Sequence, residues 1–147
     1  MINISIIDDD RAMLEQMQKI VRDAAGCGDG ISIAGYERPD AFLGENEKRK
    51  CQILVSDIDM PGMSGLEAAK RAREMNPRMF IVFVTAYMQY AIESYRMDAF
   101  QYVLKSELSD RLPRILGKLT EMIEKDKKSY GFVGTESNRK KVFYVNC

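Results

Sequence analysis

The sequence alternates short, nearly continuous apolar runs with segments of helical periodicity, and this alternation restricts the fold more than any other feature. The apolar runs predict five strands, at Ile2–Ile7, Ile31–Tyr36, Gln52–Ser56, Met79–Val84 and Phe100–Leu104. A strand that is apolar throughout is buried on both faces, which is typical of a parallel sheet covered by helices. We therefore predict an α/β fold with helices on both faces of a five-stranded parallel sheet.

The segments between these strands favour helices. Five helices are expected. The first follows the three aspartates and ends before Gly26, and the second spans Pro39–Asn46. The third begins at a Ser64–Glu67 capping box and ends at Asn76, the fourth spans Met88–Met97, and the last begins after a cap at Asp110. We prefer Asp110 as the last cap because Pro113 then lies in the first helical turn, where its missing N–H costs no hydrogen bond. Right-handed crossovers then favour the doubly wound, flavodoxin-like strand order 2-1-3-4-5.

The length of 147 residues fits one compact domain with a short appendage. We assign residues 1–126 to that domain and residues 127–147 to a linker. Within the linker, Tyr130–Val133 and Lys141–Val145 have strand composition on either side of a polar, turn-like stretch. These two segments therefore predict a β-hairpin.

Composition excludes several classes of protein. The chain has no histidine, which excludes Ser-His and Cys-His catalysis and a phosphohistidine carrier. Its three cysteines are widely spaced and odd in number, so we expect reduced thiols and no zinc site. No stretch approaches the roughly 18 apolar residues of a membrane helix, and no signal-peptide pattern opens the chain. We expect a cytoplasmic protein without a membrane partner.

Polar side chains follow four of the predicted strands at the point where each strand ends: Asp8 and Asp9, Asp57, Thr85 and Lys105. In this strand order the carboxyl ends border one crevice, so we expect these residues to gather there. Crowded carboxylates repel one another unless a cation neutralises them, and an oxygen-only ligand set favours Mg²⁺. Asp57 is then a carboxylate nucleophile for a phosphoryl group, whose oxygens Lys105 and Thr85 would hold.

A family resemblance is carried by four segments, ISIIDDD, ILVSDIDMPGMSG, FVTA and YVLK. In order, spacing and strand context they resemble the receiver domains of bacterial response regulators, over roughly residues 1–126. The resemblance implies a phosphoacceptor that catalyses only its own phosphorylation and dephosphorylation. It implies that Asp57 is phosphorylated, that Asp9 binds Mg²⁺ directly and Asp8 through water, and that the backbone carbonyl of Asp59 completes the metal shell.

The same resemblance implies a switch and its partners. Thr85 and Tyr102 resemble the family's switch pair, in which the hydroxyl moves toward the phosphate and the aromatic ring turns inward. The implied phosphoryl donor is a sensor histidine kinase. We expect the surface of the Met88–Met97 helix, the Phe100–Leu104 strand and the last helix to change, and to form a homodimer or release an output domain.

The segment TAYMQYAIESYRMDAFQYVLK also looks like the LytTR subclass, in which a receiver precedes a mostly β DNA-binding domain. This implies control of transcription through an output domain largely absent from the chain. The resemblance also implies that residues 127–147 hold the linker and the possible first hairpin of that truncated, β-rich domain. One departure from the family is Ser106, since a proline usually follows the lysine there, often through a cis bond. A cis bond before a non-proline residue costs about 3–4 kcal/mol, and the sequence leaves the isomer of the Lys105–Ser106 bond open.

Three other functions fit parts of the pattern. Asp57 and Asp59 also match the DxD pair of haloacid-dehalogenase-like phosphatases, although that family places the motif near its first strand and its acidic pair last. A degenerate receiver would serve only as an interaction module, yet each residue that phosphoryl chemistry requires is present. A flavodoxin-like FMN carrier is the least favoured, because no Ser/Thr/Gly-rich phosphate loop follows the first strand.

Overall fold

A computed structural model describes residues 1–25 and 30–133. Within them, a five-stranded sheet has the order β2-β1-β3-β4-β5, and each neighbouring pair is parallel. The strands are β1 (Ile2–Ile7), β2 (Ile31–Tyr36), β3 (Ile53–Ser56), β4 (Phe80–Thr85) and β5 (Gln101–Leu104). Ile4 of β1, an interior strand, pairs with Ile33 on one side and Ile53 on the other. The predicted fold class and strand order are confirmed.

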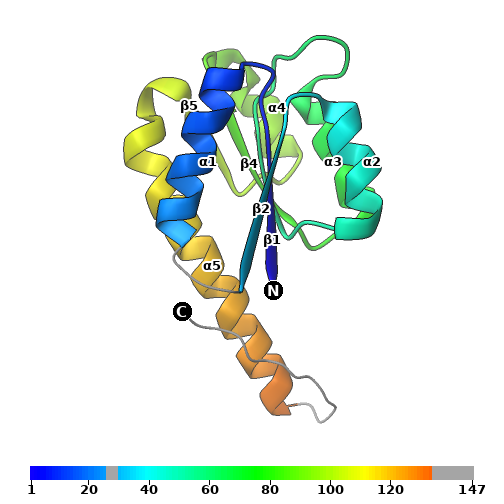
Figure 1. The fold of residues 1–147 in the computed structure, drawn as a ribbon, viewed down its shortest axis with the longest axis vertical. Helices are drawn as coiled ribbons and strands as arrows, with labels where there is room; N and C mark the ends of the chain where they lie inside the picture. Colours follow the sequence, from blue (N-terminus) through cyan, green and yellow to red (C-terminus); the bar gives the residue numbers. More distant parts are fainter. Residues whose placement is uncertain (26–29, 134–147) are drawn as a thin grey trace.

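Helices cover both faces of the sheet, as Figure 1 shows. They are α1 (Arg11–Ala25), α2 (Pro39–Arg49), α3 (Gly65–Met75), α4 (Ala91–Arg96) and α5 (Leu108–Val133), with 3₁₀ turns η1 (Met88–Tyr90) and η2 (Lys105–Glu107). Helices α1 and α5 pack on one face, and α2 and α3 pack on the other. The chain is therefore wound in both directions from β1, which places the switch point of the winding between β1 and β3.

The core explains why the strands lack polar alternation. Ile6 and Val55 belong to the cluster under α1 and α5, whereas their chain neighbours Ile7 and Leu54 belong to the cluster under α2 and α3. Side chains that point to opposite faces are thus equally buried. The interior strands therefore need apolar residues at nearly every position, which is the pattern that the sequence carries.

The start of α5 differs from the prediction. The helix begins at Leu108, so Asp110 lies in its first turn rather than at its cap, and Pro113 lies inside the helix. The physical reason is that the 3₁₀ turn η2 leads directly into α5, and its Glu107 carboxylate accepts the backbone N–H of Leu104 at 3.3 Å. The helix therefore begins three residues earlier than a cap at Asp110 would allow, and Pro113 lies where its missing N–H removes a helical bond.

The end of α5 also differs from the prediction. Tyr130–Val133, expected as a strand, forms the last residues of the continuous helix Leu108–Val133. Four of the five preceding residues, Glu124–Lys128, are glutamate or lysine, which form helices well, and propagating a formed helix costs little compared with starting one. The second expected strand, Lys141–Val145, lies outside the described residues.

Smaller shifts affect other elements. The predicted helix Met88–Met97 divides into η1 and the shorter α4. Thr85 is the last residue of β4 rather than the residue after it.

Cys51 is buried, and burial raises the pKa of its thiol to about 11, which keeps it protonated. The other two cysteines lie outside the described residues. In the part of the chain that the structure describes, no helix combines the length and hydrophobicity needed to cross a bilayer.

Candidate functional site

The three consecutive aspartates after β1 have different environments. Asp10 caps α1, because its Oδ1 accepts the backbone N–H groups of Ala12 and Met13 at 3.0 and 3.3 Å. Asp8 is fully buried, and its Oδ1 accepts the N–H of Asp10 at 2.8 Å. Asp9 is exposed. Helix capping therefore uses one carboxylate of the three and leaves Asp8 and Asp9 for another role.

Asp57 is held at the end of β3 by backbone contacts on several sides. Its N–H donates to the carbonyl of Ile7 at 3.0 Å, which ties it to β1 across the switch point. Its Oδ1 accepts the N–H of Ile58 at 2.8 Å, and the Ser56 hydroxyl donates to its carbonyl at 2.7 Å. The side chain is consequently fixed, and the residue is only 4% exposed.

Gly65, the first residue of α3, brings that helix against the backbone of Asp57. Its N–H donates to the carbonyl of Ile58 at 2.8 Å. A Cβ atom at this position would lie 1.8 Å from the carbonyl oxygen of Asp57, a distance that no side chain can occupy. The close approach of α3 to Asp57 therefore requires glycine.

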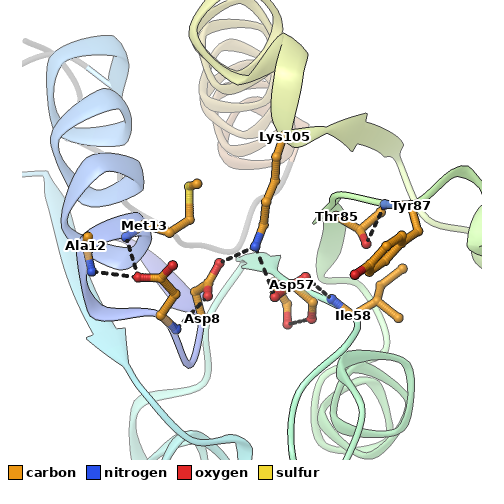
Figure 2. Close-up of polar contacts among 10 residues, drawn as sticks. Asp8, Ala12, Met13, Asp57, Ile58, Thr85, Tyr87 and Lys105 are labelled. Carbon is orange, nitrogen blue, oxygen red and sulfur yellow. Dashed lines mark hydrogen bonds and ion pairs between the residues drawn. The ribbon is translucent and has the colours of Figure 1, made fainter.

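Lys105 joins the two buried aspartates. Its Nζ lies 3.3 Å from Oδ2 of Asp8 and 3.3 Å from Oδ2 of Asp57. Figure 2 shows the lysine reaching from the end of β5 to a point between the two carboxylates. The predicted meeting of these three residues at the carboxyl edge of the sheet is observed.

Burial and charge act in opposite directions on these groups. Burial raises the pKa of Asp8 and of Asp57 above the ordinary value, and the attraction of Lys105 only partly offsets this. Burial also opposes the charge of Lys105, but Asp57 and Asp8 raise its pKa above the usual range. The lysine thus stays protonated, while the carboxylates carry an electrostatic cost that a further cation would relieve.

The arrangement fits a divalent cation. Carboxylate oxygens of Asp8, Asp9 and Asp57 lie within 4.8 Å of one another. Oδ2 of Asp8 is buried and lacks a hydrogen bond, although it pairs electrostatically with Lys105. One lysine cannot neutralise three carboxylates, and hard oxygen ligands suit Mg²⁺. Asp59 is exposed and lies outside this group of side chains.

The two predicted switch residues meet at the backbone of Tyr87. Thr85 is fully buried, and its Oγ1 accepts the N–H of Tyr87 at 3.3 Å. The hydroxyl of Tyr102 donates to the carbonyl of the same Tyr87. In the view of Figure 2, Thr85 and Asp8 lie on opposite sides of Asp57. A single peptide segment therefore connects Thr85, at the pocket, with Tyr102 on β5.

Ser106 follows Lys105 without a cis bond. No peptide bond among the described residues is cis, so the Lys105–Ser106 bond is trans. Lys105, Ser106 and Glu107 form the 3₁₀ turn η2, and Ser106 itself is exposed. The question that the sequence left open is thus settled in favour of the ordinary isomer.

Two contributors to the site were not predicted. Gly65 belongs to the segment ILVSDIDMPGMSG, but its contact with the Asp57 backbone was not predicted. Tyr87 contributes through its backbone, which carries no residue-specific signal. A glycine placed at the start of a helix that follows a buried aspartate is the one signal that could have pointed to Gly65.

Fold and site together define a flavodoxin-like α/β domain with a carboxylate and lysine pocket at the switch point of its sheet. Residues 4–117 match the response regulator receiver domain family. The chain belongs to this family, which confirms the resemblance inferred from the sequence. The match favours the receiver over the haloacid-dehalogenase-like alternative, for which the comparisons give no support.

Relatives in several bacteria are response regulators or signalling proteins. The chain is 28% identical to the sensory transduction protein LytT of Bacillus subtilis over 118 residues, which are 80% of this chain and 48% of LytT. It is 30% identical to the transcriptional regulatory protein BtsR of Salmonella typhimurium over an alignment of 149 positions, which covers all of this chain and 58% of BtsR. The chain thus spans about half the length of the relatives that it matches.

Solved structures share the fold. The response regulator TrrA of Thermotoga maritima, crystallised in complex with Mg²⁺-BeF, is 28% identical, with a TM-score of 0.70 over 81% of this chain and 99% of TrrA. The response regulatory domain of mrkE from Klebsiella pneumoniae has a TM-score of 0.74 over 84% of this chain and 99% of that domain. Its identity is 23%, so this second likeness concerns the fold alone.

Proposed function

We propose that this receiver domain accepts a phosphoryl group on Asp57 from the phosphohistidine of a sensor histidine kinase. The observation that carries the proposal is the position of Lys105, whose Nζ lies 3.3 Å from both buried carboxylates. An ammonium group between two aspartates can hold phosphoryl oxygens without leaving the pocket. The chain's own activity is then limited to its phosphorylation and dephosphorylation.

The transfer needs one bond to break and one to form. A carboxylate oxygen of Asp57 attacks phosphorus, the bond to the histidine nitrogen breaks, and an acyl phosphate results. Mg²⁺, held by the carboxylates of Asp8, Asp9 and Asp57 and by the carbonyl of Asp59, would neutralise charge on the phosphoryl oxygens. Lys105 keeps its proton and binds one of these oxygens, since its pKa is raised.

Phosphorylation would be sensed through Thr85. Its hydroxyl oxygen accepts the N–H of Tyr87, and we propose that this contact is exchanged when the hydroxyl donates to a phosphoryl oxygen. Tyr102, bound to the carbonyl of Tyr87, then follows by turning inward. The surface formed by α4, β5 and α5 changes as a result.

The output of the switch is proposed from the relatives. BtsR is named as a transcriptional regulatory protein and LytT as a sensory transduction protein, and the matched region makes up 58% of BtsR and 48% of LytT. We propose that the full protein is a cytoplasmic, LytTR-type regulator whose output domain binds DNA. Residues 127–147 would then contain the linker and the start of that domain, and α4-β5-α5 would form a homodimer.

Labelling by acetyl phosphate in the presence of Mg²⁺ tests this function. The wild-type chain should become phosphorylated, and Asp57→Asn should not, because the amide is not a nucleophile for phosphorus. Asp40→Asn, an exposed substitution at the start of α2, is the control and should label normally. Labelling that persists in Asp57→Asn would refute the site.

A further inference from the structure

Two side chains, one on η2 and one in the first turns of α5, bind the backbone of β5 next to residues that the proposed phosphotransfer uses. The Arg111 guanidinium donates to the carbonyl of Tyr102 at 3.0 Å. The Glu107 carboxylate accepts the N–H of Leu104 at 3.3 Å. We call Glu107 and Arg111 the β5 clamp.

The β5 clamp is one connected unit. Nη1 of Arg111 lies 3.2 Å from Oε1 of Glu107, the oxygen that also accepts the Leu104 N–H. Nη2 of Arg111 donates to the side-chain oxygen of Gln101 at 2.8 Å. The rigid guanidinium fork therefore links the first residue of β5, its middle and the turn that follows it.

The backbone groups that the clamp holds lie beside the functional residues. Leu104 directly precedes Lys105, whose flexible side chain must place its Nζ between Asp8 and Asp57. Tyr102 carries the hydroxyl that binds the Tyr87 carbonyl. β5 is the edge strand of the described sheet and pairs there with β4 alone, so it needs additional anchoring.

We infer that Glu107 and Arg111 are positioning residues that fix the end of β5, so that Lys105 is held ready between Asp8 and Asp57. The inference rests on the proposed phosphotransfer to Asp57. Loss of the clamp lets the Lys105 backbone shift, and the ammonium then meets the phosphoryl oxygens less often. The clamp does not touch the reacting atoms and acts through Lys105.

The chain contains a matched control pair on α5, the helix that carries Arg111. Asp110 and Arg114 have the same spacing as Glu107 and Arg111 and pair at 2.9 Å, but their side chains are 68% and 77% exposed. In the described part of the chain, Arg114 makes no hydrogen bond to β5. A role of the clamp in helix stability alone would be shared by this control pair.

The first experiment measures the rate of phosphorylation of Asp57 by acetyl phosphate in single variants. Glu107→Ala removes the acceptor of the Leu104 N–H, and Arg111→Met removes the donor to the Tyr102 carbonyl. Each should slow the reaction about fivefold. Asp110→Ala and Arg114→Met should react at the wild-type rate. Glu107→Gln keeps an acceptor for the Leu104 N–H and should recover most of the rate, which a charge effect alone would not allow.

The second experiment asks whether the clamp acts through Lys105. The affinity for Mg²⁺ with beryllofluoride is measured for Glu107→Ala in the wild-type chain and in Lys105→Met. Glu107→Ala should weaken binding about fivefold in the wild-type chain and have no effect in Lys105→Met. An equal loss of affinity in both backgrounds would overturn the inference. So would Asp110→Ala and Arg114→Met variants that lose as much as the clamp variants.

The outcomes separate the two proposals. A wild-type chain that is not labelled at Asp57 contradicts the phosphotransfer itself. Normal labelling of the wild-type chain together with clamp variants that react at its rate contradicts the clamp and leaves the phosphotransfer standing. Thermal melting of every variant in the two experiments identifies any chain that has failed to fold.

Discussion

Helices α4 and α5 precede and follow the same edge strand, yet they are held in different ways. α5 buries an apolar stripe against one face of the sheet, which includes Leu108, Leu112, Ile115, Leu116 and Leu119. α4 has six residues, all described, of which Ser94 alone is buried. Its Ile92 and Tyr95 are 66% and 84% exposed. Apolar burial therefore fixes α5, whereas α4 depends on a few polar contacts.

Arg73 of α3 provides the main polar contacts at the end of α4. Its guanidinium donates to the carbonyl of Met97, to that of Asp98 at 3.2 Å and to that of Met79 at 3.4 Å. Nε of Arg73 is buried and has no hydrogen-bond partner. The proposed phosphorylation pocket is therefore built on firmly packed elements, while part of the surface proposed to respond lies on the weakly held α4.

The largest expected effect comes from shortening a buried side chain of α5, the firmly packed helix. Leu116→Ala should destabilise the domain by about 2–5 kcal/mol, because Leu116 is fully buried and its removal leaves a cavity. Ile92→Ala on α4 should change stability by less than about 0.5 kcal/mol. Urea unfolding of both variants measures the difference. Similar losses in the two variants would show that α4 is packed as firmly as α5.

The next effect concerns the contact between α3 and the pocket. Gly65→Ala should cost about 1–3 kcal/mol, because the new methyl group meets the Asp57 carbonyl at 1.8 Å and the backbone must move. Phosphorylation of Asp57 should slow as well. Gly117→Ala in α5, where nothing lies within 4 Å of the added Cβ, should instead stabilise by about 0.5–1 kcal/mol. A stabilised Gly65→Ala variant would refute the close approach.

Strand order and the meeting of the site residues could be predicted because both follow from burial. Runs such as Ile2–Ile7 require cover on both faces, and parallel strands then bring Asp8, Asp57 and Lys105 to one edge. The start of α5 could not be predicted, because the alternatives differ by local contacts of about 1 kcal/mol. The turn at Glu107 prevailed over a cap at Asp110 through its bond to Leu104.

The parts of the site that escaped prediction depend on tertiary contacts. Gly65 matters because two distant backbones approach, and Tyr87 matters through its peptide groups. Neither contact produces periodicity or a motif. Apolar composition likewise failed at Tyr130–Val133, where continuation of α5 outweighed strand propensity.

A smaller effect tests the polar attachment of α4. Arg73→Met should cost about 1–2 kcal/mol, because it removes the hydrogen bonds to Met97 and Asp98. Amide hydrogen exchange should accelerate at the backbone of α4 and change little in α5. Arg71→Met, two residues earlier on the same helix, is the control, since Arg71 pairs with the exposed Glu67. Unchanged exchange at α4 would show that other contacts hold it.

The smallest expected effect is the pH dependence of stabilisation by Mg²⁺. Because the folded-state pKa values of Asp8 and Asp57 are raised, these groups favour folding in their protonated form, and this contribution is lost as pH rises through those values. Lys105 acts at the alkaline end, where its contribution is lost only as pH rises through its raised pKa. At neutral pH the two buried carboxylates are therefore a cost that the cation can relieve.

Mg²⁺ at about three times its Kd should stabilise the domain by about 0.8 kcal/mol at pH 7.5. The gain should shrink at about pH 4.5, because protons then compete with the cation for Asp8 and Asp57. Thermal melting with Mg²⁺, compared with the same series in Asp57→Asn, measures this effect. The cation is expected to bind at Asp8 and Asp57, on firmly packed elements. Amide hydrogen exchange at α4 should therefore remain fast when Mg²⁺ is added. Equal stabilisation at both pH values would show that Mg²⁺ binds elsewhere, and slowed exchange at α4 would show that the pocket controls that helix before any phosphorylation.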